Sequence, residues 1–290
     1  MNKRLNVRLL LRVGIALVVL GIATHLLHAF QVGRQARAFR EDGYRAAQEK
    51  DFERSADALG RYLILRPDDR EARLKRGVSL SRVAVTPAAR ERAYRFLEAS
   101  LRKGPDNVEA RETLGHLAVQ LGRFREAAQH LEPLRDAPVD RAELEQTLAW
   151  CYIGAGDHRQ AVRCFENAIR QAPTCVVNYV QLADLFQRTG QTDQARAVLD
   201  RLVRANEKSA EAHAARARYR QGVGQLDEAA DDLARARQLA PDDAGLLLET
   251  AELARRRDRL DDARHLFRDG LAAHRNDVRF PLSLARLEHD

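Results

Sequence analysis

The side chains that could perform chemistry in this 290-residue sequence are few and widely spaced. Glu109 and Glu112 are three residues apart, which would place two carboxylates on one face of a helix, as acid–base catalysis requires. The same spacing also describes two exposed acids on any helix. His25 and His28 share a face in the same way, and they could bind a metal or haem between two helices or lie at a membrane interface. The sequence contains no Gly-rich phosphate loop, HExxH or G-x-S-x-G motif, so we predict no enzyme activity, no cofactor and no metal site.

The charge of the chain is concentrated at its N-terminal end. The formal net charge is +7, from 49 basic and 42 acidic residues. Seven of the basic residues lie within residues 1–40, which contain no Asp or Glu, so the rest of the chain is formally neutral. Nucleic-acid binding needs a surplus of Lys and Arg on one surface. The sequence therefore argues against a nucleic-acid partner.

An uncharged apolar segment lies between two arginines near the N-terminus. Residues 13–30 contain 18 residues without a formal charge, bracketed by Arg12 and Arg34. As a helix this segment would be about 27 Å long, close to the roughly 30 Å hydrocarbon core of a bilayer. We expect a basic tail at 1–12, a transmembrane anchor at 13–30 and a basic neck at 31–38. A signal peptide cleaved near Ala36-Arg37-Ala38 is the alternative.

The sidedness of this membrane anchor follows from its flanking charges. Four basic residues precede the span and three follow it within the next dozen residues, so the bias is slight. Together with the free amino terminus, it favours a cytoplasmic N-terminus. Residues 31–290 are then expected on the extracytoplasmic side of the membrane.

One residue pattern recurs with a period of 34 through the remaining chain. Within one copy, Leu144, Leu148 and Tyr152 form an apolar stripe on a first helix, and Ala161 and Phe165 begin a second stripe. A glycine turn joins the two helices, and a small alanine lets them approach closely. The repeated residues are Gly122, Gly156, Gly190 and Gly224 in the turn, and Ala127, Ala161, Ala195, Ala229 and Ala263 in the second helix. The pattern predicts an all-α array of helical hairpins.

This pattern resembles the tetratricopeptide repeat, and with the N-terminal anchor the chain resembles bacterial membrane-anchored members of that family. One copy matches the family at Leu148, Tyr152, Gly156, Phe165 and Pro173. The resemblance covers residues 39–290 and implies a right-handed superhelical solenoid of about seven repeats plus one terminal helix. About four extra residues around 83–87 are expected to lengthen one turn, and Pro133 is expected to make a second helix irregular.

Three cysteines lie within or between these repeats. Cys151, Cys164 and Cys175 form no CxxC pair. The first two occupy interior repeat positions, where a small apolar side chain fits, so we expect buried thiols. A disulfide between Cys151 and Cys164 is the alternative if the domain is extracytoplasmic.

The resemblance also implies where a partner would bind. In the family, the first helix of each repeat lines a concave groove that holds a peptide or a helix. Trp150 is expected either to anchor a partner there or to pack along the groove wall. The asparagine that chaperone-binding members carry in the groove does not occur at the matching positions, so another ligand is implied. The groove candidates are Tyr44, His116, Trp150, Asp184, Arg188, Arg218, Glu252 and Arg255.

Two roles for such a chain remain open. The first is a membrane-anchored scaffold, or an assembly and recruitment factor, that binds an unknown protein or peptide partner. The second is a structural component that forms homo-oligomers through the apolar C-terminal helix, which contains Phe280, Leu282, Leu284 and Leu287. The sequence does not identify the partner.

Overall fold

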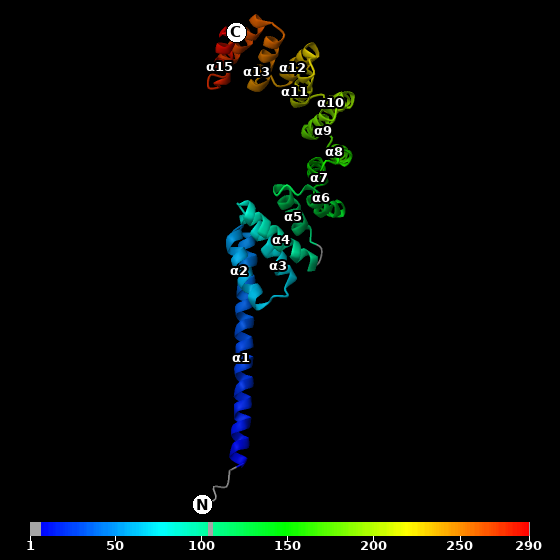
Figure 1. Cartoon of the computed structure of the whole chain (residues 1–290). Coiled ribbons are helices and arrows are strands. Elements are labelled where there is room, and N and C mark those ends of the chain that lie inside the picture. The colour runs from blue at the N-terminus through cyan, green and yellow to red at the C-terminus, as the bar shows by residue number, and fades with distance from the viewer. Residues whose placement is uncertain (1–6, 104–106, 290) are drawn as a thin grey trace, which may run out of the picture. The chain divides into compact units, whose positions relative to one another are not determined.

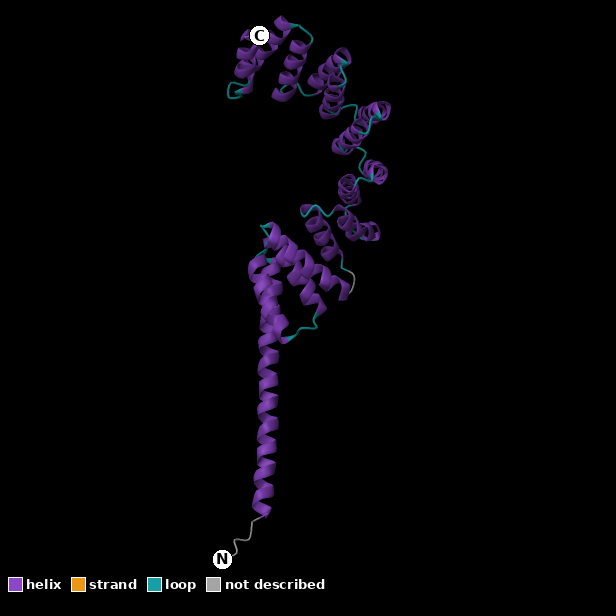
Figure 2. Ribbon diagram, in the orientation of Figure 1, coloured by secondary structure: helices purple, strands orange, loops and turns teal. Residues whose placement is uncertain are grey.

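All regular structure in the described residues is helical. The structure is a computed structural model, and it describes the backbone of residues 7–103 and 107–289. Within that range no strand occurs, and successive helices pair as antiparallel hairpins (Figures 1 and 2). The predicted all-α solenoid of helical hairpins is therefore confirmed. The chain divides into two compact units, residues 1–138 (unit 1) and 139–290 (unit 2).

The helix boundaries follow the predicted repeats. Unit 1 contains α1 (Val7–Gln48), α2 (Phe52–Leu65), α3 (Arg70–Val83), α4 (Pro87–Lys103), α5 (Val108–Gln120), α6 (Phe124–Leu131) and the 3-10 helix η1 (Glu132–Asp136). Unit 2 contains α7 (Arg141–Ala155), α8 (His158–Gln171), α9 (Val176–Arg188), α10 (Thr192–Ala205), α11 (Ala210–Gly222), α12 (Leu226–Leu239), α13 (Ala244–Arg256), α14 (Leu260–Ala273) and α15 (Arg279–His289).

Helix α1 continues unbroken from the apolar N-terminal segment into the first repeat. The predicted neck, 31–38, is part of this helix, and Ala36 within it is buried in a cluster with Leu59, Tyr62 and Leu63 of α2. Among the residues that the structure describes, no helix is long and apolar enough to cross a membrane. The side chains of residues 13–16, 18 and 19, which belong to the predicted anchor 13–30, lie outside the described residues.

Local sequence signals begin and end the helices. Asp140 caps α7 by accepting hydrogen bonds from the backbone N–H groups of Ala142 (2.9 Å) and Glu143 (3.1 Å). Gly156 ends the same helix in the left-handed region, at φ +80°. The last hairpin turn has Asp258 at the equivalent position, with φ +61°. The turn geometry thus persists where the glycine does not.

Small residues at the helix crossings allow close packing inside each hairpin. Ala161 and Phe165 are fully buried, as the repeat pattern predicts. In unit 1, a Cβ atom added to Gly115 would lie 2.5 Å from the Leu131 side chain. The hairpin of α5 and α6 therefore has room for glycine alone at this crossing.

Two repeats of unit 1 depart from the regular hairpin in different ways. The expected lengthening of the turn around 83–87 is wrong, because α3 ends at Val83 and α4 begins at Pro87, a spacing like that of the other hairpins. The extra residues instead extend α4 to 17 residues, against 14 in the second helix of most other hairpins. The predicted irregularity at Pro133 is confirmed, since α6 ends after eight residues and continues as η1.

The C-terminal helix covers the end of unit 2 with one of its faces. Phe280 and Leu287 of α15 are buried with Phe267 of α14. Val278, just before the helix, and Leu282 on it are 67% and 66% exposed. Some apolar residues near this end therefore pack against α14, and others are exposed to solvent.

The two interior cysteines are buried. Cys151 is completely buried and Cys164 is 1% exposed. Burial raises the pKa of the Cys151 thiol to about 11. Cys151 is a free thiol, so the alternative disulfide with Cys164 is not formed.

Candidate partner-binding groove

Three groove candidates of unit 2 gather around one pocket. The pocket lies between α9, α10 and α11 and has a volume of about 250 Å³. Val180, Ala183 and Leu199 contribute apolar surface, and Asp184 and Arg218 contribute opposite charges. Arg188 also lies beside this site, because its guanidinium NH1 is 3.4 Å from Asp184 Oδ2. Residues from two successive repeats therefore form one apolar depression with a charged rim.

Arg218 connects two successive first helices of unit 2. It donates two hydrogen bonds to Glu249 Oε1 on α13, at 2.8 Å and 3.0 Å. The Arg218 side chain is 56% exposed, and an ion pair this accessible contributes little to stability. Its guanidinium can exchange one carboxylate for another at low cost.

The candidates on α13 also form an ion pair. Arg255 Nε lies 3.1 Å from Glu252 Oε2, one turn away on the same helix. Beside them, Arg256 donates to the side-chain and backbone oxygens of Gln221 on α11, at 3.2 Å and 3.1 Å. Polar side chains on this face thus contact one another both within a helix and across neighbouring repeats.

Trp150 packs along the groove wall and also leaves surface that could anchor a partner. Its ring is 42% exposed, so part of it is accessible to a partner. Its other contact is with the buried Phe165, at a centroid distance of 6.2 Å and an interplanar angle of 84°. This edge-to-face packing fixes the indole while leaving surface for binding. Trp150 does not line the pocket that contains Asp184 and Arg218.

The two candidates in unit 1 occupy different surroundings. Tyr44 is partly buried against the core, under the guanidinium of Arg40 at 4.9 Å from the ring centre, and its hydroxyl is buried without a hydrogen-bond partner. Burial, followed by the negative charge of Glu71, raises the pKa of Tyr44 to about 12. His116 is exposed and lines a separate pocket of about 460 Å³ with Glu109 and Glu112.

The acid pair noted in the sequence therefore lies at an open surface pocket. Lys75 is 3.2 Å from one carboxylate oxygen of Glu109. Within the described residues, no group of three or more His, Cys, Asp and Glu side chains could hold a metal ion. This arrangement offers carboxylates for a basic partner group.

A buried charge network on α10, α11 and α12 was missed by sequence reasoning. Asp232 is 3% exposed and accepts hydrogen bonds from Arg216 at 2.7 Å and 3.0 Å and from Arg220 at 2.8 Å. Arg216 also donates to Asp200 at 2.8 Å. Burial acts to lower the pKa of Arg216, and the bonds to Asp232 and Asp200 more than reverse this, so its pKa is raised. The available signal was Arg220 at the repeat position that holds Tyr152 and Phe186 in earlier copies.

Comparison with known proteins identifies the repeat type. A family model described as tetratricopeptide repeat matches residues 89–151 and 152–219. A curated relative, "Cellulose synthase operon protein C" from Xanthomonas axonopodis pv. citri (strain 306), is 31% identical over 157 residues. The match covers 51% of this chain and 10% of the relative, so the chain spans about a tenth of that protein's length.

Solved structures with the same fold cover most of this chain's length. The MamA protein aligns with a TM-score of 0.52 and 20% identity, covering 62% of this chain and 96% of MamA. A tetratricopeptide repeat protein from Parabacteroides merdae ATCC 43184 aligns with a TM-score of 0.52 and 15% identity, covering 89% of this chain and all of that one. At these identities the similarity shows the fold alone.

Proposed function

This chain is a tetratricopeptide repeat protein, and we propose that it acts as a scaffold that holds a partner protein on the first helices of unit 2. The observation that carries the proposal is the pocket with Val180, Leu199, Asp184 and Arg218. Its volume of about 250 Å³ is below the roughly 300–1,000 Å³ of typical small-molecule sites. An apolar side chain on a partner helix or peptide suits it better than a free small ligand.

The charged rim supplies the polar part of this recognition. A carboxylate on the partner would replace Glu249 at Arg218, and a basic group would bind Asp184. Because these exposed pairs are weak within the free protein, exchanging them for partner contacts costs little. Trp150 adds an exposed aromatic surface of the kind that anchors partners.

Affinity capture from solubilised membranes tests this proposal. We expect the full-length protein to retain a partner that is lost from the Trp150→Ala/Arg188→Ala/Arg218→Ala variant, as read by mass spectrometry. The matched control, Leu260→Ala/Arg159→Ala/Arg204→Ala, changes exposed residues outside this face, including an apolar side chain with the same 42% exposure as Trp150. Equal capture by all three proteins would contradict the groove proposal.

The scaffold is further proposed to be anchored to a membrane through residues 13–30, with its N-terminus cytoplasmic and both units on the extracytoplasmic side. The described part of this segment supports the proposal, because Leu20, Leu26 and Phe30 are each more than 60% exposed on α1. Apolar side chains exposed around a helix need lipid or protein cover. We expect the protein to resist carbonate extraction, and the Leu26→Arg/Leu27→Arg variant to be released. Release of the wild-type protein would remove the anchor from the proposal.

A second candidate function is self-assembly through the C-terminal helix. The observation that favours it is the exposure of two apolar side chains at this end of the chain. Val278, just before α15, is 67% exposed, and Leu282, on α15, is 66% exposed. If this end joins two copies, the protein sediments as an oligomer and Leu282→Asp makes it monomeric, with partner capture unchanged. A monomeric wild-type protein would eliminate this candidate.

A further inference from the structure

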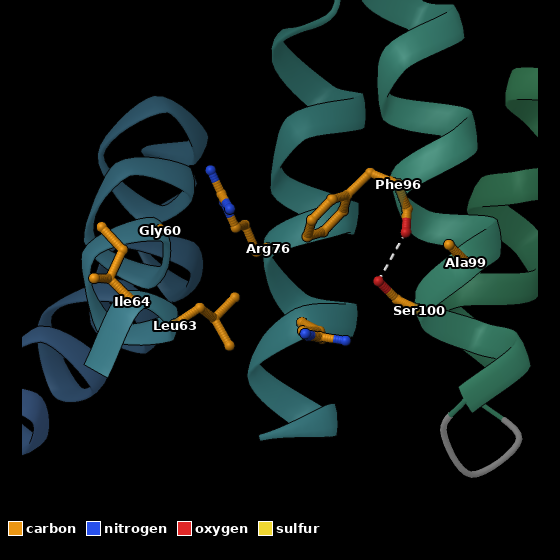
Figure 3. A pocket seen from close by; sticks show the side chains of 8 residues that line it. Gly60, Leu63, Ile64, Arg76, Phe96, Ala99 and Ser100 are labelled. Atoms are coloured by element: carbon orange, nitrogen blue, oxygen red, sulfur yellow. Dashed lines mark hydrogen bonds between the residues drawn. The ribbon is translucent and has the colours of Figure 1, made fainter. Parts of the chain in front are cut away.

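A further pocket belongs to unit 1, whereas the proposed groove belongs to unit 2. It has a volume of about 360 Å³ and lies between α2, α3 and α4. Figure 3 shows Leu63 and Ile64 of α2 on one side, Phe96 of α4 on the other, and Arg76 of α3 extending between them. Ile64 is 80% exposed at the rim. The pocket combines an open apolar edge with cationic side chains.

Among the described residues, the cations of this pocket have no acidic partner of the kind that other arginines of the protein have. Its lining includes Arg73 and Arg76 and no Asp or Glu. The guanidinium of Arg76 lies 5.3 Å from the centre of the Phe96 ring, and its Nε is buried without a hydrogen-bond partner. By contrast, Arg123 in the same unit is paired with Glu91 at 2.9 Å. The buried Nε is closed to an external ligand, so an anion supplied from outside would bind the outer guanidinium nitrogens of Arg76 and Arg73.

The pocket lies at the end of unit 1 from which α1 extends. Leu63 of its lining packs in the same cluster as Ala36 of α1. Ala36 is six residues after Phe30, the last residue of the proposed span, which corresponds to about 9 Å along the helix. The headgroup layer of a bilayer is about 5–7 Å thick on each side of the hydrocarbon core. With its long side chains, the pocket would therefore reach the headgroups of the membrane that holds α1.

Exposed arginines surround this end of the unit. Arg34 and Arg37 lie on α1, and Arg66 and Arg70 lie at the turn between α2 and α3. The acids of the same turn are partly committed, because Asp69 and Glu71 pair with Arg40 at 3.6 Å and 3.3 Å. A cluster of positive charges beside a membrane span attracts the anionic headgroups of the leaflet that it faces. The cluster would concentrate such lipids at the mouth of the pocket.

We propose that Arg73 and Arg76 bind the phosphate of an anionic phospholipid headgroup in the bilayer that holds α1, with the exposed side chain of Ile64 against the apolar part of the same lipid. This inference rests on the membrane anchor of the proposed function. An acidic segment of a protein could also satisfy two guanidinium groups. The lipid is favoured because the pocket lies at the membrane end of unit 1 and because its most exposed side chain is aliphatic. Headgroup binding would fix the orientation of unit 1 at the membrane surface.

The test has two stages and uses the full-length protein. First, flotation with phosphatidylcholine liposomes establishes whether the chain inserts. Second, native mass spectrometry in neutral detergent measures the binding of phosphatidylglycerol and of phosphatidylcholine with the same acyl chains. We expect tighter binding of phosphatidylglycerol. We expect Arg73→Gln/Arg76→Gln to weaken it about 25-fold, from roughly fivefold for each positive charge near an anionic lipid.

Matched variants separate this site from general charge and from folding. Arg92→Gln/Arg125→Gln removes two exposed charges elsewhere in unit 1 and should leave the lipid affinity within about twofold, while Arg73→Lys/Arg76→Lys should retain most of it. Circular dichroism checks that each variant is folded. An equal loss in the Arg92/Arg125 variant would overturn the assignment to this pocket.

Three further results would overturn the proposal. Equal affinity for the two lipids would show that no anionic headgroup is recognised. Displacement of phosphatidylglycerol by equimolar inorganic phosphate, or by a glutamate-rich peptide, would assign the site to a free anion or to a protein. Failure to float would remove both the anchor and the lipid site, whereas flotation without lipid preference would remove the lipid site alone.

Discussion

Helix α11 has two arginines, two residues apart, in opposite environments. Arg216 points into the repeat and bonds to Asp232, whose side chain is 4% exposed. Arg218 points to the groove side and pairs with Glu249, with 56% of its own side chain exposed. Both pairs have good bidentate geometry. The difference between them is therefore the amount of water around each pair.

This difference assigns the two ion pairs to separate roles. Removing one partner of a buried pair leaves an uncompensated charge in a poorly solvated site, which is strongly destabilising. An exposed pair loses only a screened attraction when it is broken. We therefore attribute structure to the Asp232 network and exchangeable binding contacts to the Arg218 side. The predictions below test that separation, beginning with the largest expected effect.

The largest effect on stability is expected at the buried Asp232 network. Asp232→Ala leaves Arg216 and Arg220 without their shared acceptor and should lower the free energy of unfolding by about 3–5 kcal/mol. Urea unfolding followed by the fluorescence of Trp150, the single tryptophan, reports on unit 2. The adjacent exposed Asp231→Ala is the control and should change stability by less than about 0.5 kcal/mol. Similar values for the two variants would contradict the structural role of the network.

The repeat architecture could be predicted from the sequence because periodicity and residue size determine it. The 34-residue spacing of Gly156 and Ala161 with their counterparts predicted both the turns and the tight crossings. The Asp232 network could not be predicted in the same way. Its four members are charged residues that any exposed helix could carry, and only the three-dimensional packing of α10, α11 and α12 brings them together.

The sequence predicted which helix face carries the candidate site, but it did not predict which side chains contact one another there. Repeat positions placed Asp184 and Arg218 on first helices, and the structure brings both to one pocket. The link between Arg218 and Glu249 depends on the distance between successive repeats, which a one-dimensional pattern does not contain. The pocket at Arg76 was missed because its outline requires three helices from two repeats.

A smaller effect is expected from a cluster in unit 1 in which a partly buried histidine contacts a tyrosine hydroxyl. The Tyr94 hydroxyl donates to Glu126 at 3.0 Å and lies 3.1 Å from His130 Nε2. Burial lowers the pKa of His130, against the opposing charges of Glu98 and Glu126. Because the folded-state pKa is below the unfolded value of about 6.5, the uncharged ring stabilises the fold above that pH. This stabilisation is lost as the pH falls through the lowered folded-state pKa.

Acid titration of stability tests this behaviour. The urea midpoint of the wild-type protein, followed by circular dichroism, should fall between pH 7 and pH 5 by more than that of His130→Gln. Parallel midpoints for wild type and His130→Gln would show that His130 does not control the response.

The smallest stability effect is expected at the exposed end of the comparison, where the binding role is proposed. Arg218→Ala should lower the free energy of unfolding by less than about 0.5 kcal/mol, because the pair with Glu249 is accessible to water and salt. Arg216→Ala, on the same helix, should cost several times more, since Asp232 and Asp200 then share only Arg220. Urea unfolding at 0.05 M and 0.5 M NaCl sharpens the contrast, because salt should reduce the small effect of Arg218→Ala and leave that of Arg216→Ala nearly unchanged. If Arg218→Ala proved as destabilising as Arg216→Ala, the groove pair would be a structural contact, and Arg218 would no longer be a suitable residue to exchange Glu249 for a partner carboxylate.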